Sequence, residues 1–152
     1  MTDLHELELL IVEDNDQDLE LTLRALKKAR ISNRIEIARD GVEALDYFFG
    51  EHSHQSRTIN NVTKLVLLDL KLPKISGLEV LERIKSDPRT KKIPVVVLTS
   101  SNQDTDIERC YQLGVNSYIV KPVDFERFAT AVQELGMYWL LLNQTPSHSQ
   151  PT

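Results

Sequence analysis

The sequence predicts an α/β fold in which helices cover both faces of a doubly wound, five-stranded parallel sheet. Three observations support this prediction. Short apolar runs alternate with turns and helix-period segments five times along the chain, which is the pattern of repeated βα units. Most of the apolar runs are nearly continuous, as expected of strands buried on both faces. The length of 152 residues, with 41% hydrophobic and 27% charged residues, suits one compact domain.

Five segments are predicted strands, taken here in chain order. Residues 7–12 are a near-continuous apolar run, whereas residues 34–37 alternate apolar and charged side chains, which favours an edge strand with one wetter face. Residues 65–68 and 94–98 are again apolar runs, and the short segment 118–120 is the last. Right-handed crossover connections between such strands leave few topologies to consider.

Five helices are predicted after these strands. In the first, Leu19, Leu23 and Leu26 fall on one face. Asp40 and Ser76 are each followed three residues later by a glutamate, a typical helix start. The expected helices cover residues 16–30, the segment from the Asp40 cap through Phe48, the segment from the Ser76 cap to Asp87-Pro88, residues 103–113 before Gly114, and the segment that Asp124 caps.

Charge and composition exclude several classes of partner. The 18 Lys and Arg residues against 23 Asp and Glu residues give a net charge of −5, which argues against nucleic-acid binding through bulk charge. No apolar run approaches the roughly 20 residues that a membrane span needs. The lone Cys110 excludes an internal disulfide, and residues 1–5 lack the features of a secretory signal. We therefore expect a cytoplasmic protein with no nucleic-acid or membrane partner.

Polar residues occupy the carboxyl ends of the predicted strands, where open α/β sheets bind their ligands. Glu13 and Asp14 follow the first strand, Asp69 the third, Thr99 the fourth and Lys121 the fifth. Three carboxylates at one edge would repel one another unless a cation lay between them. Because the available ligands are all oxygen atoms, a hard cation such as Mg²⁺ is expected.

This set of residues can carry phosphoryl chemistry. A carboxylate beside Mg²⁺ and a lysine ammonium can attack phosphorus, because the two cations neutralise charge on the phosphoryl oxygens. The product would be an aspartyl phosphate. Any one of the acidic residues alone would more simply be a solvated turn residue or a helix cap. The ordered combination at four strand ends favours the phosphoryl site.

The combination resembles the receiver domain of two-component response regulators. The match covers roughly residues 7–136 and includes the run Leu-Leu-Asp-Leu-Lys-Leu-Pro-Lys around Asp69 and the pair Lys121-Pro122. The resemblance implies a flavodoxin-like sheet with strand order 2-1-3-4-5. It also implies that Asp69 accepts phosphate from the phosphohistidine of a sensor kinase. The protein would then be a phosphoacceptor with slow autodephosphorylation rather than an enzyme.

The resemblance also implies a metal site. Asp14, Asp69 and the backbone carbonyl of Lys71 would ligate Mg²⁺ or Mn²⁺ directly, and Glu13 would do so through water. Lys121 would bridge to the phosphoryl oxygens, and the bond between it and the following proline is expected to be cis.

A conformational switch follows from the same resemblance. A phosphoryl group adds close to two negative charges and three acceptor oxygens, and the nearest neutral donor is the Thr99 hydroxyl. Movement of Thr99 toward the phosphoryl group vacates space. The resemblance implies that Tyr118 rotates into this space and changes the surface formed by the fourth helix, the fifth strand and the fifth helix.

The last predicted helix extends beyond a receiver core and carries apolar residues at spacings of three and four, among them Phe125, Trp139 and Leu142. Residues 137–142 are apolar on nearly every side, which indicates a partner surface and favours a symmetric homodimer through this helix. Residues 137–152 are too few for a DNA-binding module, so the output is expected to be a protein contact. The predicted organisation is a single receiver domain over residues 1–143 and a disordered tail over residues 144–152.

A narrower resemblance concerns the partner. The extended last helix, the long segment 50–63, the Glu-Asp pair after the first strand and Leu-Pro-Lys after Asp69 resemble the small stand-alone regulators that serve cyanobacterial bacteriophytochromes. This resemblance implies a phytochrome-type sensor histidine kinase as the partner.

Three other functions remain open at this point. A haloacid-dehalogenase-like phosphatase also uses a strand-end aspartate with Mg²⁺, but it needs an acid at the position of Lys71. A flavin or nucleotide binder would need a small-residue phosphate cradle after the first strand, where residues 13–16 are instead mostly acidic. A constitutive dimeric scaffold is disfavoured only by the presence of Asp69, Thr99 and Lys121 together.

Overall fold

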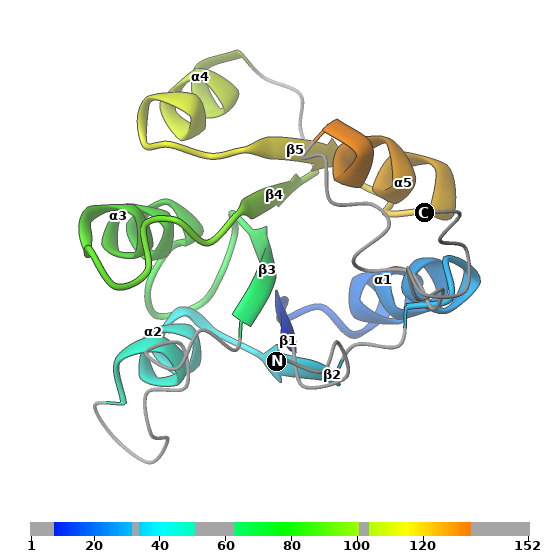
Figure 1. Cartoon of the computed structure of the whole chain (residues 1–152), viewed down its shortest axis with the longest axis horizontal. Coiled ribbons are helices and arrows are strands. Elements are labelled where there is room, and N and C mark those ends of the chain that lie inside the picture. Colours follow the sequence, from blue (N-terminus) through cyan, green and yellow to red (C-terminus); the bar gives the residue numbers. More distant parts are fainter. Residues whose placement is uncertain (1–7, 32–33, 51–62, 101–103, 135–152) are drawn as a thin grey trace, which may run out of the picture.

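The structure is a computed structural model that describes residues 8–31, 34–50, 63–100 and 104–134. Its five strands form one parallel sheet in the order β2-β1-β3-β4-β5, which confirms the predicted topology (Figure 1). The strands are β1 (Glu8–Val12), β2 (Arg34–Ala38), β3 (Thr63–Asp69), β4 (Val95–Thr99) and β5 (Ser117–Val120).

A helix follows each strand, and side-chain caps open three of them where the sequence predicts. The carboxylate of Asp40 accepts the Glu43 N–H at 2.8 Å, and the hydroxyl of Ser76 accepts the Glu79 N–H at 3.2 Å. The carboxylate of Asp124 likewise accepts the N–H of the residue three positions on, at 2.9 Å. The helices are α1 (Asp16–Lys28), α2 (Gly41–Phe49), α3 (Gly77–Ser86), α4 (Asp104–Gln112) and α5 (Phe125–Glu134).

The apolar core lies in two layers, one on each face of the sheet. Helices α1 and α5 cover one face, and α2, α3 and α4 cover the other (Figure 1). Along β1, Leu9 and Ile11 pack toward α1 and α5, whereas Leu10 and Val12 pack toward the opposite helices. This two-sided burial explains why the central strands are continuously apolar in sequence. Among the described residues, no helix is long and apolar enough to cross a membrane.

The end of α1 differs slightly from expectation. Helix α1 ends at Lys28, two residues before the predicted boundary, because Arg30 adopts a left-handed conformation with φ of 59°. Strand β2 is an edge strand, as predicted, and Ile37 on it is 41% exposed. The difference at α1 therefore concerns a boundary and leaves the element itself unchanged.

Close backbone contacts fix the loops at the carboxyl edge of the sheet. A Cβ atom on Gly41 would lie 2.2 Å from the carbonyl oxygen of Ile75, so the start of α2 packs directly on the loop after β3. A Cβ atom on Gly77 would lie 2.3 Å from the carbonyl oxygen of Asp69, and the Gly77 N–H donates to Leu70 O at 2.9 Å. These two glycines hold the loop that follows Asp69 against its neighbours.

Replacing Gly41 by alanine should therefore destabilise the fold. The new methyl group would overlap the backbone of Ile75, so we expect the free energy of unfolding to fall by about 1–3 kcal/mol. Urea denaturation followed by circular dichroism measures this change. Glu82→Ala, at an exposed position of α3, is the control and should stay within about 0.5 kcal/mol of the unsubstituted protein. Equal losses in the two variants would show that the contact does not constrain the loop.

Candidate functional site

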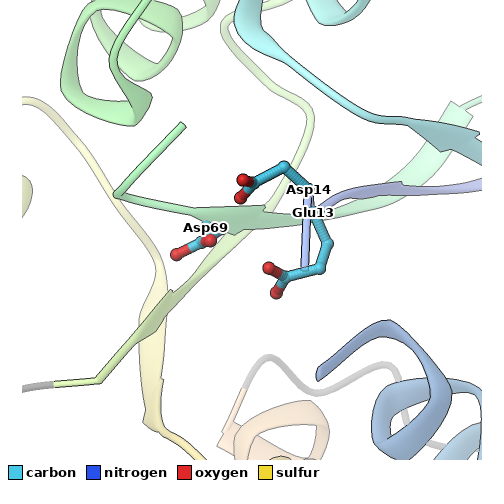
Figure 2. A group of neighbouring side chains, drawn as sticks. All are labelled: Glu13, Asp14 and Asp69. Atoms are coloured by element: carbon cyan, nitrogen blue, oxygen red, sulfur yellow. The ribbon is translucent and has the colours of Figure 1, made fainter. Parts of the chain in front are cut away.

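Three carboxyl groups meet at the carboxyl edge of the sheet. Glu13 and Asp14 follow β1, and Asp69 is the last residue of the neighbouring strand β3. One carboxylate oxygen from each lies within 4.8 Å of the others, and Figure 2 shows the three side chains leaving adjacent strand ends. Glu13 is fully buried and Asp69 is 4% exposed, whereas Asp14 is exposed. The sheet thus brings together the acidic residues that the sequence predicts.

Lys121 reaches into this group from the end of β5. Its ammonium nitrogen lies 3.0 Å from Glu13 Oε1 and 3.3 Å from Asp69 Oδ2. A third carboxylate, from Asp18 in α1, is the nearest of all, with Oδ2 at 2.9 Å. The backbone N–H of Lys121 donates to Thr99 O at 2.7 Å, which joins the ends of β4 and β5. The lysine is only 11% exposed at its side chain, so these contacts lie largely out of solvent.

Asp18 is a residue of this acidic group that the sequence pattern did not single out. It lies in the first turn of α1, where the side chain of Asn15 caps the helix by accepting the Asp18 N–H at 2.9 Å. An acidic residue in a first turn is already explained by the helix dipole, so nothing singled it out. One signal was available: this first turn follows Glu13 and Asp14 with only the capping Asn15 between them, so its side chains start close to the strand end.

Two further predicted residues border the acidic group. Thr99 is the last residue of β4, next to β3 in the sheet, and it is 4% exposed. The backbone N–H of Lys71 donates to Asp69 Oδ1 at 3.2 Å, while the Lys71 side chain is exposed. The peptide bond between Lys121 and Pro122 is cis, as predicted. All of the strand-end residues chosen from the sequence therefore lie at one edge.

Burial and mutual repulsion shape the protonation of the site. Burial, together with the neighbouring carboxyl group of Asp69, raises the pKa of Glu13 to about 7, although Lys121 acts in the opposite direction. Burial alone would lower the pKa of Lys121, but Asp18, Glu13 and Asp69 outweigh it and raise that pKa above its ordinary value. Lys121 is therefore a permanent positive charge, and Glu13 is the group that exchanges a proton near neutral pH.

The donor set fits a hard divalent cation. Glu13 Oε1 is buried and forms an ion pair with Lys121, but no described residue donates a hydrogen bond to it, so it is suited to accept one from a water molecule held by a metal ion. Asp14 offers an exposed carboxylate beside Asp69. Carboxylate and carbonyl oxygens are the ligands that Mg²⁺ and Mn²⁺ favour.

Comparison with known proteins decides the family. Residues 9–133 match the family described as the response regulator receiver domain. The chain belongs to this family. The receiver resemblance seen in the sequence is thereby confirmed, together with the flavodoxin-like order of its strands.

Several receiver proteins are similar over most of their length. The probable methanogenesis regulatory protein FilR2 of Methanothrix harundinacea (strain 6Ac) is 45% identical over 91% of this chain and 86% of its own. The solved structure of the bacteriophytochrome response regulator AtBRR is 49% identical, with a TM-score of 0.76, over 90% of this chain and 97% of that one. The solved Mn²⁺-bound form of the response regulator Rcp1 is 36% identical, with a TM-score of 0.70, over 91% of this chain and 96% of that one.

Tyr118 of this receiver lies away from the acidic group. Its side chain is 36% exposed on β5, and its ring meets that of Tyr111 edge to face, with centroids 6.2 Å apart. Both rings line a hollow of about 520 Å³ between α4, β5 and α5, to which Arg127 and Glu134 also contribute. The residue predicted to rotate therefore starts beside open space on the surface that it is expected to change.

The predicted dimer residues divide between described and undescribed parts of the receiver. Phe125 is partly buried against the core layer of α1 and α5, and Lys28 Nζ lies 5.5 Å from the centre of its ring. Trp139 and Leu142 lie outside the described residues, as do the predicted helical extension and the tail over residues 144–152.

The proton on Glu13 should make the stability of the cation-free receiver depend on pH. Between about pH 5 and pH 7 the unfolded chain, with a glutamate pKa near 4.5, has lost this proton while the folded protein still holds it. The free energy of unfolding should therefore fall as pH rises through this window. Glu13→Gln removes the proton exchange and should flatten this part of the curve. Urea denaturation in a chelating buffer at pH 5, 6, 7 and 8 measures both proteins, and parallel curves would contradict the assignment.

Proposed function

We propose that this receiver accepts a phosphoryl group on Asp69 from the phosphohistidine of a sensor histidine kinase, of the phytochrome type. A carboxylate oxygen of Asp69 attacks phosphorus, an oxygen–phosphorus bond forms, and the phosphorus–nitrogen bond breaks with its electron pair returning to the imidazole. The observation that supports this most strongly is the position of Asp69 among Glu13, Asp14 and the ammonium group of Lys121. The similarity to a bacteriophytochrome response regulator supports the choice of kinase.

Residues around Asp69 have distinct tasks in this reaction. The Lys71 N–H, donating to Oδ1 at 3.2 Å, orients the Asp69 carboxylate. Lys121, whose ammonium nitrogen lies 3.3 Å from Asp69 Oδ2, offers positive charge to the phosphoryl oxygens. Asp14, Asp69 and the carbonyl of Lys71 would hold Mg²⁺ or Mn²⁺, with Glu13 reached through water, and the bound cation supplies further positive charge to the transferred group.

The transferred group then acts on the rest of the fold. Its added charge and acceptor oxygens attract the hydroxyl of Thr99 from the neighbouring strand. Inward movement of Thr99 opens room for Tyr118, which leaves its contact with Tyr111 and alters the surface of α4, β5 and α5. The output is a change in protein contacts. The buried, unpaired Cys110 is compatible with a reducing compartment such as the cytoplasm.

Slow loss of the phosphoryl group is expected rather than rapid hydrolysis. A phosphatase of the haloacid-dehalogenase kind would need an acid two residues after Asp69, where this chain has the exposed Lys71. A lysine at position 71 therefore favours a phosphoacceptor that keeps the phosphoryl group over an enzyme that hydrolyses it.

Substitution of the acceptor tests the function directly. With a phosphorylated histidine-kinase core and Mg²⁺, the unsubstituted protein should take up label, and Asp69→Asn should take up none because an amide is not a nucleophile here. Asp106→Asn, the same chemical change in α4, should label normally. A chelator should prevent labelling in every variant. Labelling of Asp69→Asn would show that another residue is the acceptor.

We also propose that the receiver forms a homodimer through its last helix. The apolar residues from Phe125 to Leu142 support this, and Trp139 is the largest among them. Trp139→Ala should raise the dimer dissociation constant roughly tenfold or more, measured by analytical ultracentrifugation. The control is Leu21→Ala, which removes an apolar side chain that is 39% exposed on α1. An unchanged dimer in Trp139→Ala would remove this helix from the interface.

A further inference from the structure

Three carboxylates already surround the ammonium group of Lys121 before any phosphoryl group arrives. A lysine ammonium has three N–H donors and no acceptor. Three carboxylates surround it, with oxygens of Asp18 at 2.9 Å, Glu13 at 3.0 Å and Asp69 at 3.3 Å. The ammonium donates hydrogen bonds to Asp18 Oδ2 at 2.9 Å and to Glu13 Oε2 at 3.3 Å, so a phosphoryl oxygen on Asp69 competes with these two carboxylates for it.

The three carboxylates differ in how easily they can give up the ammonium group. Glu13 is fully buried, so water cannot replace Lys121 as its hydrogen-bond partner. Asp69 carries the phosphoryl group itself. Asp18 has a side chain that is 31% exposed, so water can solvate its carboxylate once the ammonium moves away. It is therefore the partner that can be exchanged at the lowest free-energy cost.

We propose that Asp18 is a positioning residue that restrains Lys121, holding its ammonium group on the α1 side of the site and releasing it when the phosphoryl group binds. This inference rests on the proposed phosphorylation of Asp69. The carboxylate of Asp18 competes with the phosphoryl oxygens for one ammonium group, so it limits both how fast the phosphorylated state forms and how strongly Lys121 supports it. Asp18 also accepts the shorter of the two hydrogen bonds that Lys121 Nζ donates, at 2.9 Å against 3.3 Å for Glu13 Oε2.

The same turn of α1 contains a matched control. Asp16 also carries one negative charge near the strand ends, but its carboxylate pairs with Arg39 rather than with Lys121. Asp16→Asn and Asp18→Asn therefore remove the same charge and keep the same shape. Only the second removes the ion pair with Lys121. Asp18→Glu keeps the charge and tests rescue.

The experiment measures phosphorylation by phosphoramidate in Mg²⁺, followed by intact mass, and binding of beryllofluoride as a mimic of the phosphoryl group. We expect Asp18→Asn to be phosphorylated roughly 3- to 30-fold faster than Asp16→Asn and to bind beryllofluoride more tightly by a similar factor, because Lys121 is released. Asp18→Glu should return close to the unsubstituted rate. A purely structural role for Asp18 would slow the reaction or leave it unchanged, and thermal unfolding of each variant monitors folding.

The outcomes separate this inference from the function on which it rests. If the unsubstituted protein is phosphorylated on Asp69 but Asp18→Asn matches Asp16→Asn or is slower, the restraint by Asp18 is wrong and the proposed function stands. If the unsubstituted protein takes up no phosphoryl group at all, both are wrong. A faster Asp18→Asn together with rescue by Asp18→Glu supports the restraint.

Discussion

The carboxyl edge of this sheet depends on the ammonium group of Lys121. Glu13 and Asp69 come from adjacent central strands and are almost completely buried, so without a cation their charges would repel each other with little water to screen them. Lys121 arrives from the far strand β5 and contacts both. The strand order makes this possible, because it places β1 and β3 side by side. The end of β5 is then close enough for the long side chain of Lys121 to reach both carboxyl groups.

Most of the fold could be predicted because its signals are local. Continuous apolar runs mark the strands that are buried on both faces, and the capping side chains of Asp40, Ser76 and Asp124 mark where helices begin. The end of α1 was harder to predict from the sequence. It depends on the positive φ of Arg30, a residue type that gives no turn signal, and on the N–H of Ile31 donating back to Leu26 O at 3.1 Å.

The site was predictable as a set of residues and less so as a geometry. A parallel sheet places every carboxyl end at one edge, so Asp69 and Lys121 could be brought together from sequence alone. The burial of Glu13 beside the exposed Asp14 could not be predicted, because it depends on how Asp69 and Lys121 from other strands pack around the Glu13 side chain. The contact with Asp18 depends on how far a lysine side chain extends from another strand, which no local pattern records.

The Lys121 N–H donates a hydrogen bond to Thr99 O at 2.7 Å. This bond joins the backbones of two residues of the site, one at the end of β5 and one at the end of β4. Displacing either strand end would therefore disturb Thr99 and Lys121 together, the two residues proposed to contact the phosphoryl group. Rotation of side chains, with the backbone of both strands in place, avoids this disturbance. In the proposed switch, rotation of the Thr99 and Tyr118 side chains therefore changes the surface while the hydrogen-bonded strand ends keep their places.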